Sequence, residues 1–153
     1  MIFNRSHYED LLVTRVHKLI DKPTWTARYE RIRAFETLLA DNGTTILKFF
    51  LYISKEEQLA RFGERLDDLT RNWKISESDY AEREHWNAYM EAYEEAIERT
   101  SAPHAPWYVI PANHKWFRNL AVSQIVVDTM EELGMEYKPA VDLAKITSGH
   151  GHS

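Results

Sequence analysis

The stretch ILKFFLYISKEEQLARFGERLDDLTRNWKISESDYAEREHW, residues 46–86, indicates the fold class. It begins within a run from Thr45 to Ile53 that is almost continuously apolar, β-branched or aromatic. Because apolar and polar residues do not alternate there, we predict a strand buried on both faces, as in a parallel sheet covered by helices. Lys48 interrupts the run, and it either snorkels to an edge of the sheet or marks a functional end of it.

A helix with a clear start signal follows this strand. Ser54 is the predicted N-cap, and Glu57 completes a capping box three residues later. Arg61 and Arg65 are four residues apart and therefore share one face of the helix. The side chains expected to face the core are Leu59, Phe62 and Leu66. The helix is predicted to end at Asp67-Asp68, where a polar loop begins.

The rest of the chain alternates helices with short strands, which favours an α/β layer with a parallel sheet. Met1–Phe3 reads as the end of a strand, and Asp21-Lys22-Pro23 as a helix break. Gly43 and Gly134 are expected to end helices in the left-handed conformation. The further predicted elements are helices from Ser6 toward Leu19, at 26–40, 78–99 (with a Ser76/Asp79 capping box) and 115–133, and a strand at 107–110.

Composition limits the class of protein. The length of 153 residues fits one domain or a large piece of one, and the hydrophobic content of 44% is sufficient for a core. A net charge of −5 argues against a general nucleic-acid binder. The chain has no cysteine, so disulfides and thiol chemistry are excluded, which suits a cytoplasmic protein. We find no secretion signal at the start and no apolar run of membrane-spanning length, and we expect no membrane association.

Two groups of residues could contact phosphate. Arg61 and Arg65 could clamp a polyanion with their guanidinium forks, or they could simply pair with acidic neighbours on the surface. The triplet Asn4-Arg5-Ser6 follows the presumed first strand, where ligands collect in α/β sheets. It could touch phosphate or the water shell of a metal, or Ser6 could be only an N-cap.

Two further basic segments follow presumed loops or strands. The loop containing Arg71, Trp73 and Lys74 could close over a substrate as a lid, or it could be an ordinary surface loop. Lys115 and Arg118 lie at the start of the last predicted helix, whose N-terminus favours anions, although they could also mark only a helix start.

Three ordered blocks resemble the C-terminal part of the polyphosphate kinase 2 family. They are FNRSHYEDLLVTRV at 3–16, RYERIRAFETLLADNGTTILKFFLYISKEEQLARFGERLDD at 28–68, and NWKISESDYAEREHWNAYMEAYEEAIERTSAPHAPWYVIPANHKWFRNLAV at 72–122. The resemblance implies an incomplete P-loop kinase-like parallel sheet flanked by helices, with a helical lid at about residues 55–80. It predicts one domain at residues 1–138 and a flexible tail at 139–153.

The resemblance also implies an activity. The family moves a phosphoryl group between inorganic polyphosphate and a nucleoside mono- or diphosphate (ADP, AMP and ATP are the nucleotides involved), with Mg²⁺. It is oligomeric, so a homo-oligomer is expected.

By the same resemblance, individual residues receive roles. Asn4 and Arg5 lie beside the transferring phosphates, and Glu9 lies near the nucleotide and the metal. Asn4 stands where some members have aspartate, so it is expected to bind Mg²⁺ less strongly than a carboxylate. The cations expected to hold phosphate or substrate are Arg61, Arg65 and Lys74 of the lid, with Lys115 and Arg118 of the last basic cluster.

Two departures from the family pattern stand out. Leu69 occupies a lid position where the family usually has proline. More importantly, no glycine in the sequence is followed by lysine, so the Walker A phosphate loop is missing. We therefore expect impaired activity in isolation. The alternative is a non-catalytic remnant or an oligomerisation module acting through the helix at 78–99, and an ATP-dependent nucleoside monophosphate kinase fits less well.

Overall fold

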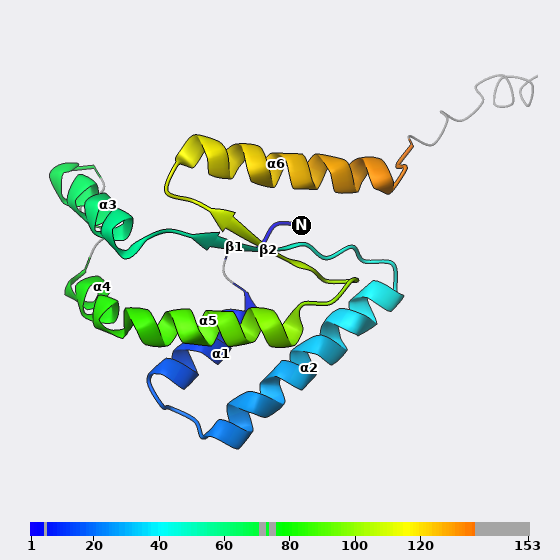
Figure 1. The fold of residues 1–153 in the computed structure, drawn as a ribbon, viewed down its shortest axis with the longest axis horizontal. Helices are drawn as coiled ribbons and strands as arrows, with labels where there is room; N and C mark the ends of the chain where they lie inside the picture. Colours follow the sequence, from blue (N-terminus) through cyan, green and yellow to red (C-terminus); the bar gives the residue numbers. More distant parts are fainter. Residues whose placement is uncertain (5, 71–72, 74–75, 137–153) are drawn as a thin grey trace, which may run out of the picture. The chain divides into compact units, whose positions relative to one another are not determined.

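The computed structural model describes residues 1–4, 6–70, 73 and 76–136 (Figure 1). The elements in chain order are α1 (His7–Val16), α2 (Lys22–Asp41), β1 (Lys48–Tyr52), α3 (Lys55–Asp67), α4 (Glu77–Glu82), η2 (Arg83–His85), α5 (Trp86–Thr100), β2 (Trp107–Pro111) and α6 (Lys115–Glu132). The chain divides into two units, Met1–Arg118 and Asn119–Ser153. No helix among the described residues has the length and apolarity needed to cross a membrane.

The two strands pair in parallel, as the sequence predicted. The register runs from Lys48 beside Trp107 to Tyr52 beside Pro111. The prediction that the first strand is buried on both faces is wrong for its carboxyl half, because Leu51 and Tyr52 are 46% and 41% exposed. The described sheet has only these two strands, so each strand lacks a neighbour on one side.

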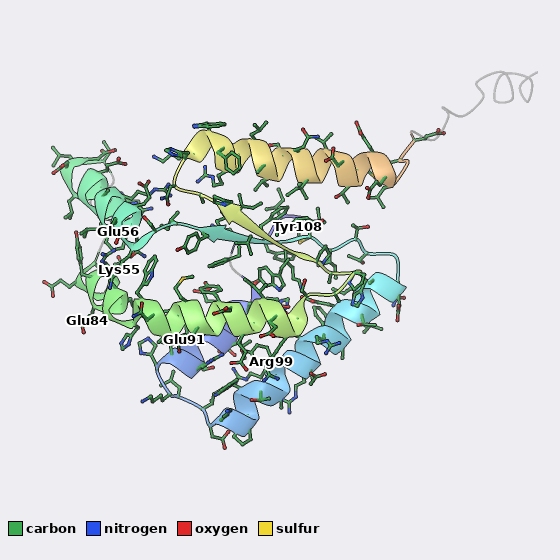
Figure 2. The ribbon with its side chains drawn as sticks, viewed as in Figure 1. Lys55, Glu56, Glu84, Glu91, Arg99 and Tyr108 are labelled. Carbon is green, nitrogen blue, oxygen red and sulfur yellow. The ribbon has the colours of Figure 1, made fainter. Side chains whose placement is uncertain are left out.

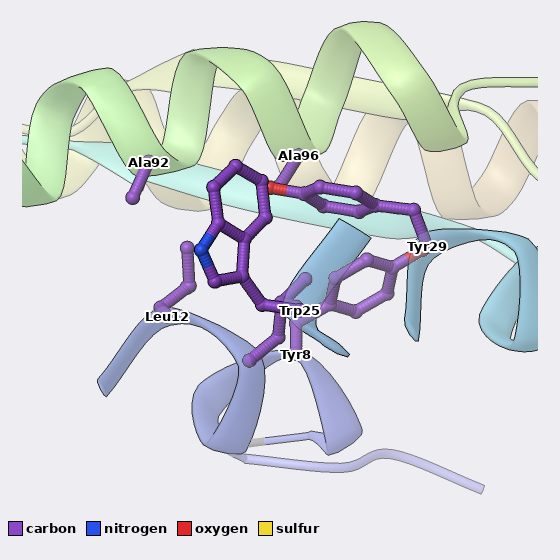
Figure 3. Close-up of a cluster of buried hydrophobic side chains, with 7 residues drawn as sticks. Tyr8, Leu12, Trp25, Tyr29, Ala92 and Ala96 are labelled. Atoms are coloured by element: carbon purple, nitrogen blue, oxygen red, sulfur yellow. The ribbon is translucent and has the colours of Figure 1, made fainter. Parts of the chain in front are cut away.

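A hydrophobic core lies where α1, α2 and α5 pack together in the first unit (Figure 3). Ala92 and Ala96 of α5 are fully buried, and their small side chains leave room for the aromatic residues of the other two helices. The Trp25 and Tyr29 rings of α2 meet edge to face, with centroids 6.0 Å apart. The buried members of this core are Tyr8, Leu11, Leu12, Trp25, Tyr29, Ala92 and Ala96.

Several local start and stop signals were interpreted correctly. Ser6 and Ser54 cap α1 and α3, and the Ser76/Asp79 capping box opens α4. Gly43 and Gly134 adopt positive φ angles of 82° and 56° after their helices.

Two helix predictions need correction. The segment predicted as a helix break, Asp21-Lys22-Pro23, is itself the start of the second helix. Asp21 caps α2 and Pro23 lies in its first turn. The helix predicted over 78–99 is interrupted by the 3₁₀ turn η2. We attribute the interruption to tertiary contacts: Glu82 pairs with His17 at the end of α1, while Arg83 donates to the Lys55 carbonyl of α3.

Three other expectations are also wrong. Met1–Phe3 forms no strand and is exposed. On α3 only Phe62 is buried, whereas Leu59 and Leu66 are each nearly half exposed. Lys48 is the first residue of β1 but does not snorkel to an edge; its side chain is 8% exposed and forms an ion pair with Glu36 of α2. The predicted tail at 139–153 lies outside the described residues.

Candidate functional site

A cleft of about 460 Å³ lies beside the carboxyl end of β1 in the first unit. It is bordered by α1, β1, α3, α4, η2 and α5. Its aromatic lining residues are Phe50, Tyr52, Trp86, Tyr89 and Tyr93, and its charged or titratable ones include Glu9, His17, Asp79, Glu82 and Arg83. Ligands of open α/β sheets bind at the carboxyl ends of the strands, so this cleft is the first candidate site.

The aromatic side of the cleft is well packed. Phe50 of β1 and Tyr93 of α5 lie with ring centroids 4.5 Å apart. Burial raises the pKa of the Tyr93 phenol, so this group stays neutral at physiological pH. Trp86 stands at the first position of α5 and is half-buried. The lining therefore offers flat apolar faces to a planar ligand group.

A hydrogen-bonded cluster links the end of α1 to α4 and α5. The His17 Nε2 atom lies 3.0 Å from Glu82 Oε1, and the Tyr89 hydroxyl donates to Glu82 Oε2 at 2.9 Å. Burial raises the pKa of Glu82, but hydrogen bonds from Tyr89 and His17 outweigh it, and the pKa lies below its usual value. Burial and the Glu82 carboxylate raise the pKa of Tyr89 to about 12.

Arg61 and Arg65 have different surroundings although they lie one turn apart. Arg61 is 17% exposed, and its Nη2 donates to the carbonyls of Ala112 and Asn113 at 2.7 and 3.0 Å. Its Nε donates to Glu57 at 2.8 Å. Arg65 is exposed. Arg61 thus fastens α3 to the segment after β2, and the phosphate role of both arginines stays a prediction.

The other predicted site residues are distributed over several places. Of the predicted site residues that the structure describes, Glu9, in the first turn of α1, is the one on the cleft lining. Asn4 is exposed just before α1, while Lys115 and Arg118 lie in the first turn of α6. Arg5 and Lys74 lie outside the described residues.

Sequence reasoning missed two features of this site. The aromatic lining was visible only as an apolar stripe on the helix predicted over 78–99. Arg83 was not singled out, yet it donates to the Lys55 carbonyl at 2.9 Å and to Gln58 Oε1 at 2.7 Å. The signal that could have revealed the aromatic lining was the aromatic-rich stripe immediately after the lid segment. No local pattern marked Arg83.

A second cavity of about 490 Å³ is a weaker candidate. Its lining consists of Arg15, Arg99 and the glutamates Glu91, Glu94, Glu95 and Glu98. Figure 2 labels two of them, Glu91 and Arg99, both on α5. Glu95 pairs with both Arg15 and Arg99 at 2.7 Å. The arginines are therefore occupied, and the remaining carboxylates would repel a phosphate ligand.

Comparison with known proteins identifies the family. Residues 1–138 match the model of the family described as Polyphosphate kinase 2. The chain belongs to the polyphosphate kinase 2 family. The prediction from the sequence blocks is thereby confirmed, together with the α/β fold class.

Three members illustrate the relationship. AMP/ADP-polyphosphate phosphotransferase of Meiothermus ruber is 57% identical over 137 residues, which cover 90% of this chain and 51% of that protein. ADP-polyphosphate phosphotransferase of Rhodopseudomonas palustris is 45% identical over 148 residues, covering 89% and 51%. Polyphosphate kinase 2 from Arthrobacter aurescens TC1 superposes with a TM-score of 0.90 at 45% identity, covering 95% and 52%. The chain spans about half the length of these relatives.

Proposed function

We propose that this chain takes part in phosphoryl transfer between inorganic polyphosphate and a nucleoside mono- or diphosphate. The observation that carries the proposal is the aromatic cleft at the end of β1, with Glu9 on its lining, in a chain 57% identical to an AMP/ADP-polyphosphate phosphotransferase. Aromatic rings bind nucleobases by stacking, and the cleft supplies several of them. The proposal includes a homo-oligomeric state and a cytoplasmic location, the latter supported by the lack of cysteine.

The residues divide into two groups under this proposal. The aromatic lining holds the base, and Glu9 orients the nucleotide from the first turn of α1. Arg65 and Lys74 hold the polyphosphate and stabilise the charge that develops during transfer. Arg61 positions α3 through the carbonyls of Ala112 and Asn113.

Magnesium fits the chemistry of these residues. Mg²⁺ prefers oxygen ligands and is usually held by one or two carboxylates together with water and substrate phosphates. Glu9 offers a carboxylate and Asn4 an amide oxygen, whereas no group of three or more histidine, cysteine or acidic residues in the described ranges is arranged so that it could hold a metal ion by itself. Bound Mg²⁺ would neutralise part of the charge on the phosphates, with Glu9 and Asn4 as its protein ligands.

The direct test is a transfer assay with the purified chain, Mg²⁺, polyphosphate and either ADP or AMP. We expect little ATP or ADP from the chain alone, because backbone donors and a lysine of a phosphate loop are missing from its sequence. Addition of the part of the Meiothermus ruber relative that lies outside the match should raise transfer strongly. In that mixture Arg65→Ala should lower turnover at least tenfold, which corresponds to an activation barrier raised by about 1.4 kcal/mol. The control Arg33→Ala on α2 should leave turnover unchanged.

A second candidate is a non-catalytic module of the same family. The observation that favours it is that no glycine in the sequence is followed by lysine, as a Walker A phosphate loop would require. A cooperatively folded chain that stays inactive with and without the added part would overturn the proposed activity and favour this alternative.

A further inference from the structure

A charged cluster is buried between α1, α2, α5 and the start of β1. The Lys48 Nζ atom lies 2.7 Å from Oε2 of Glu36, and the two side chains are only 8% and 3% exposed. The ammonium group also donates to the Tyr8 hydroxyl at 3.1 Å and to the Thr100 carbonyl at 2.8 Å. Each of its three N–H bonds therefore has a partner.

The Tyr8 hydroxyl joins the two charges. It accepts from Lys48 and donates to Oε1 of Glu36 at 2.9 Å. The Tyr8 ring meets the Trp107 ring edge to face, with centroids 4.9 Å apart. Burial raises the pKa of Tyr8 far above its ordinary value, so the hydroxyl keeps its proton and remains a donor. Tyr8 is thus fixed at both its ring and its hydroxyl.

Tyr8 belongs to the turn that carries Glu9. Ser6 caps this turn: its Oγ accepts from the Tyr8 N–H at 3.4 Å, and its carbonyl accepts from the Glu9 N–H at 3.0 Å. Successive residues of an α-helix point about 100° apart around the axis. With Tyr8 pointing into the core, Glu9 is directed to the cleft, which it lines.

We propose that the Glu36–Lys48 pair is a positioning device that acts through Tyr8 to fix the rotation of the first turn of α1 and to direct Glu9 into the cleft. Its importance for substrate rests on the proposed function of the cleft, but the geometry is measurable without activity. Neither Glu36 nor Lys48 lines the cleft. A buried ion pair contributes little net stability compared with apolar residues of the same volume. Orientation is therefore its main effect.

The test removes one oxygen atom. Tyr8→Phe keeps the ring and the Glu36–Lys48 pair but cuts the link to α1. Tyr29→Phe is the matched control, because Tyr29 is fully buried in the same core and its hydroxyl instead accepts at 3.2 Å from Arg15, which lies in the last turn of α1 and outside the measured residues Glu9 to Leu12. Amide hydrogen exchange is measured by NMR in α1 (Glu9 to Leu12) and in α5 (Ala92 to Ala96), and ADP binding is titrated on each variant.

We expect Tyr8→Phe to accelerate exchange in α1 about tenfold more than in α5, since a lost buried hydrogen bond acts locally. It should also weaken ADP binding several-fold. Tyr29→Phe should neither accelerate exchange at Glu9 to Leu12 more than in α5 nor weaken ADP binding. Equal acceleration in α1 and α5 of the Tyr8→Phe chain would overturn the positioning role. If the unchanged chain does not bind ADP, the proposed function fails, and the exchange rates alone decide whether the pair positions α1.

Discussion

At the scale of single residues, Lys48 and Glu36 are stable only as a pair. Burial lowers the pKa of Lys48, and the hydrogen bond and charge of Glu36 oppose this in part. Burial raises the pKa of Glu36, but hydrogen bonds from His7, Lys48 and Tyr8 outweigh it, so that the pKa lies below its usual value. Removal of one charge leaves the other buried without compensation, which is costly.

Removing one charge of the pair should therefore cost more stability than removing both. Lys48→Met should lower the free energy of unfolding by about 3–5 kcal/mol, because it strands the Glu36 carboxylate. The double variant Glu36→Gln with Lys48→Met should lower it by less, since no isolated charge remains. Urea denaturation monitored by circular dichroism measures both values. A double variant as unstable as the single one would contradict this account.

Glu36 should also make stability depend on pH. Its pKa is lower in the folded chain, so the unfolded chain takes up more protons as the pH falls through the carboxyl range. The stabilisation is complete at neutral pH and is lost on acidification below about pH 5. The free energy of unfolding of the unchanged chain should therefore fall more steeply between neutral and acidic pH than that of Glu36→Gln. Parallel curves for the two chains would disprove the assignment to Glu36.

At the scale of elements, α3 is fastened in two directions. Arg61 ties it to the carbonyls after β2, and the Ser54 N–H donates to Asn113 Oδ1 at 2.9 Å. From the other side, Arg83 of η2 bonds to Lys55 and Gln58. A 3₁₀ segment between two α-helices is often a hinge, and here η2 joins α4 to α5. The orientation of α3 therefore depends on these side chains more than on core packing.

The two arginines of α3 should differ in how much they contribute to the stability of the fold. Arg61→Ala should speed amide exchange throughout α3 and cost about 1–3 kcal/mol of stability, because two carbonyls lose a charged donor. Arg65→Ala should change stability by less than about 0.5 kcal/mol, as expected for an exposed side chain. Thermal unfolding and hydrogen exchange of both variants provide the comparison. Equal losses of stability would show that Arg61 has no special structural role.

Local signals explain what the sequence allowed us to predict, and tertiary contacts explain what it did not. Capping residues such as Ser54 act within one turn, so their positions were correct. The interruption at Arg83–His85 arises from bonds to residues about 25 and 65 positions away, for which no local pattern exists. Lys48 was misinterpreted for the same reason, because its partner Glu36 lies on α2 and not near the strand in the sequence. The aromatic residues of the cleft could be seen in the sequence, but the sequence did not show that those of β1 and α5 line the same cleft.

At the scale of the whole molecule, the described residues form a sheet of two parallel strands. Its two strands leave unpaired edges, and Val109 and Leu51 are 55% and 46% exposed. Unpaired strand edges readily accept a further strand. Since the relatives are about twice as long, the remaining part of such a relative is a natural partner for these strands.

Complementation should thus be visible in the sheet itself. On addition of the unmatched part of the Meiothermus ruber relative, exchange of the amides in β1 or β2 should slow at least tenfold, because new backbone bonds protect them. Exchange in the core of α1 and α5 should change less. Unrelated protein at the same concentration is the control, and no protection in either strand would argue against strand addition.

The position of Trp86 on the lining of the cleft has an optical consequence. Indole emission depends on the groups and the water that touch the ring, so a molecule entering the cleft would alter the light that Trp86 emits. Trp25, 9% exposed in the core, and Trp107, half-buried against it, would emit a constant blue-shifted background. Trp73 and Trp116, 75% and 67% exposed, could be suppressed first with acrylamide in solution. The chain thus carries its own reporter of occupancy and needs no attached dye.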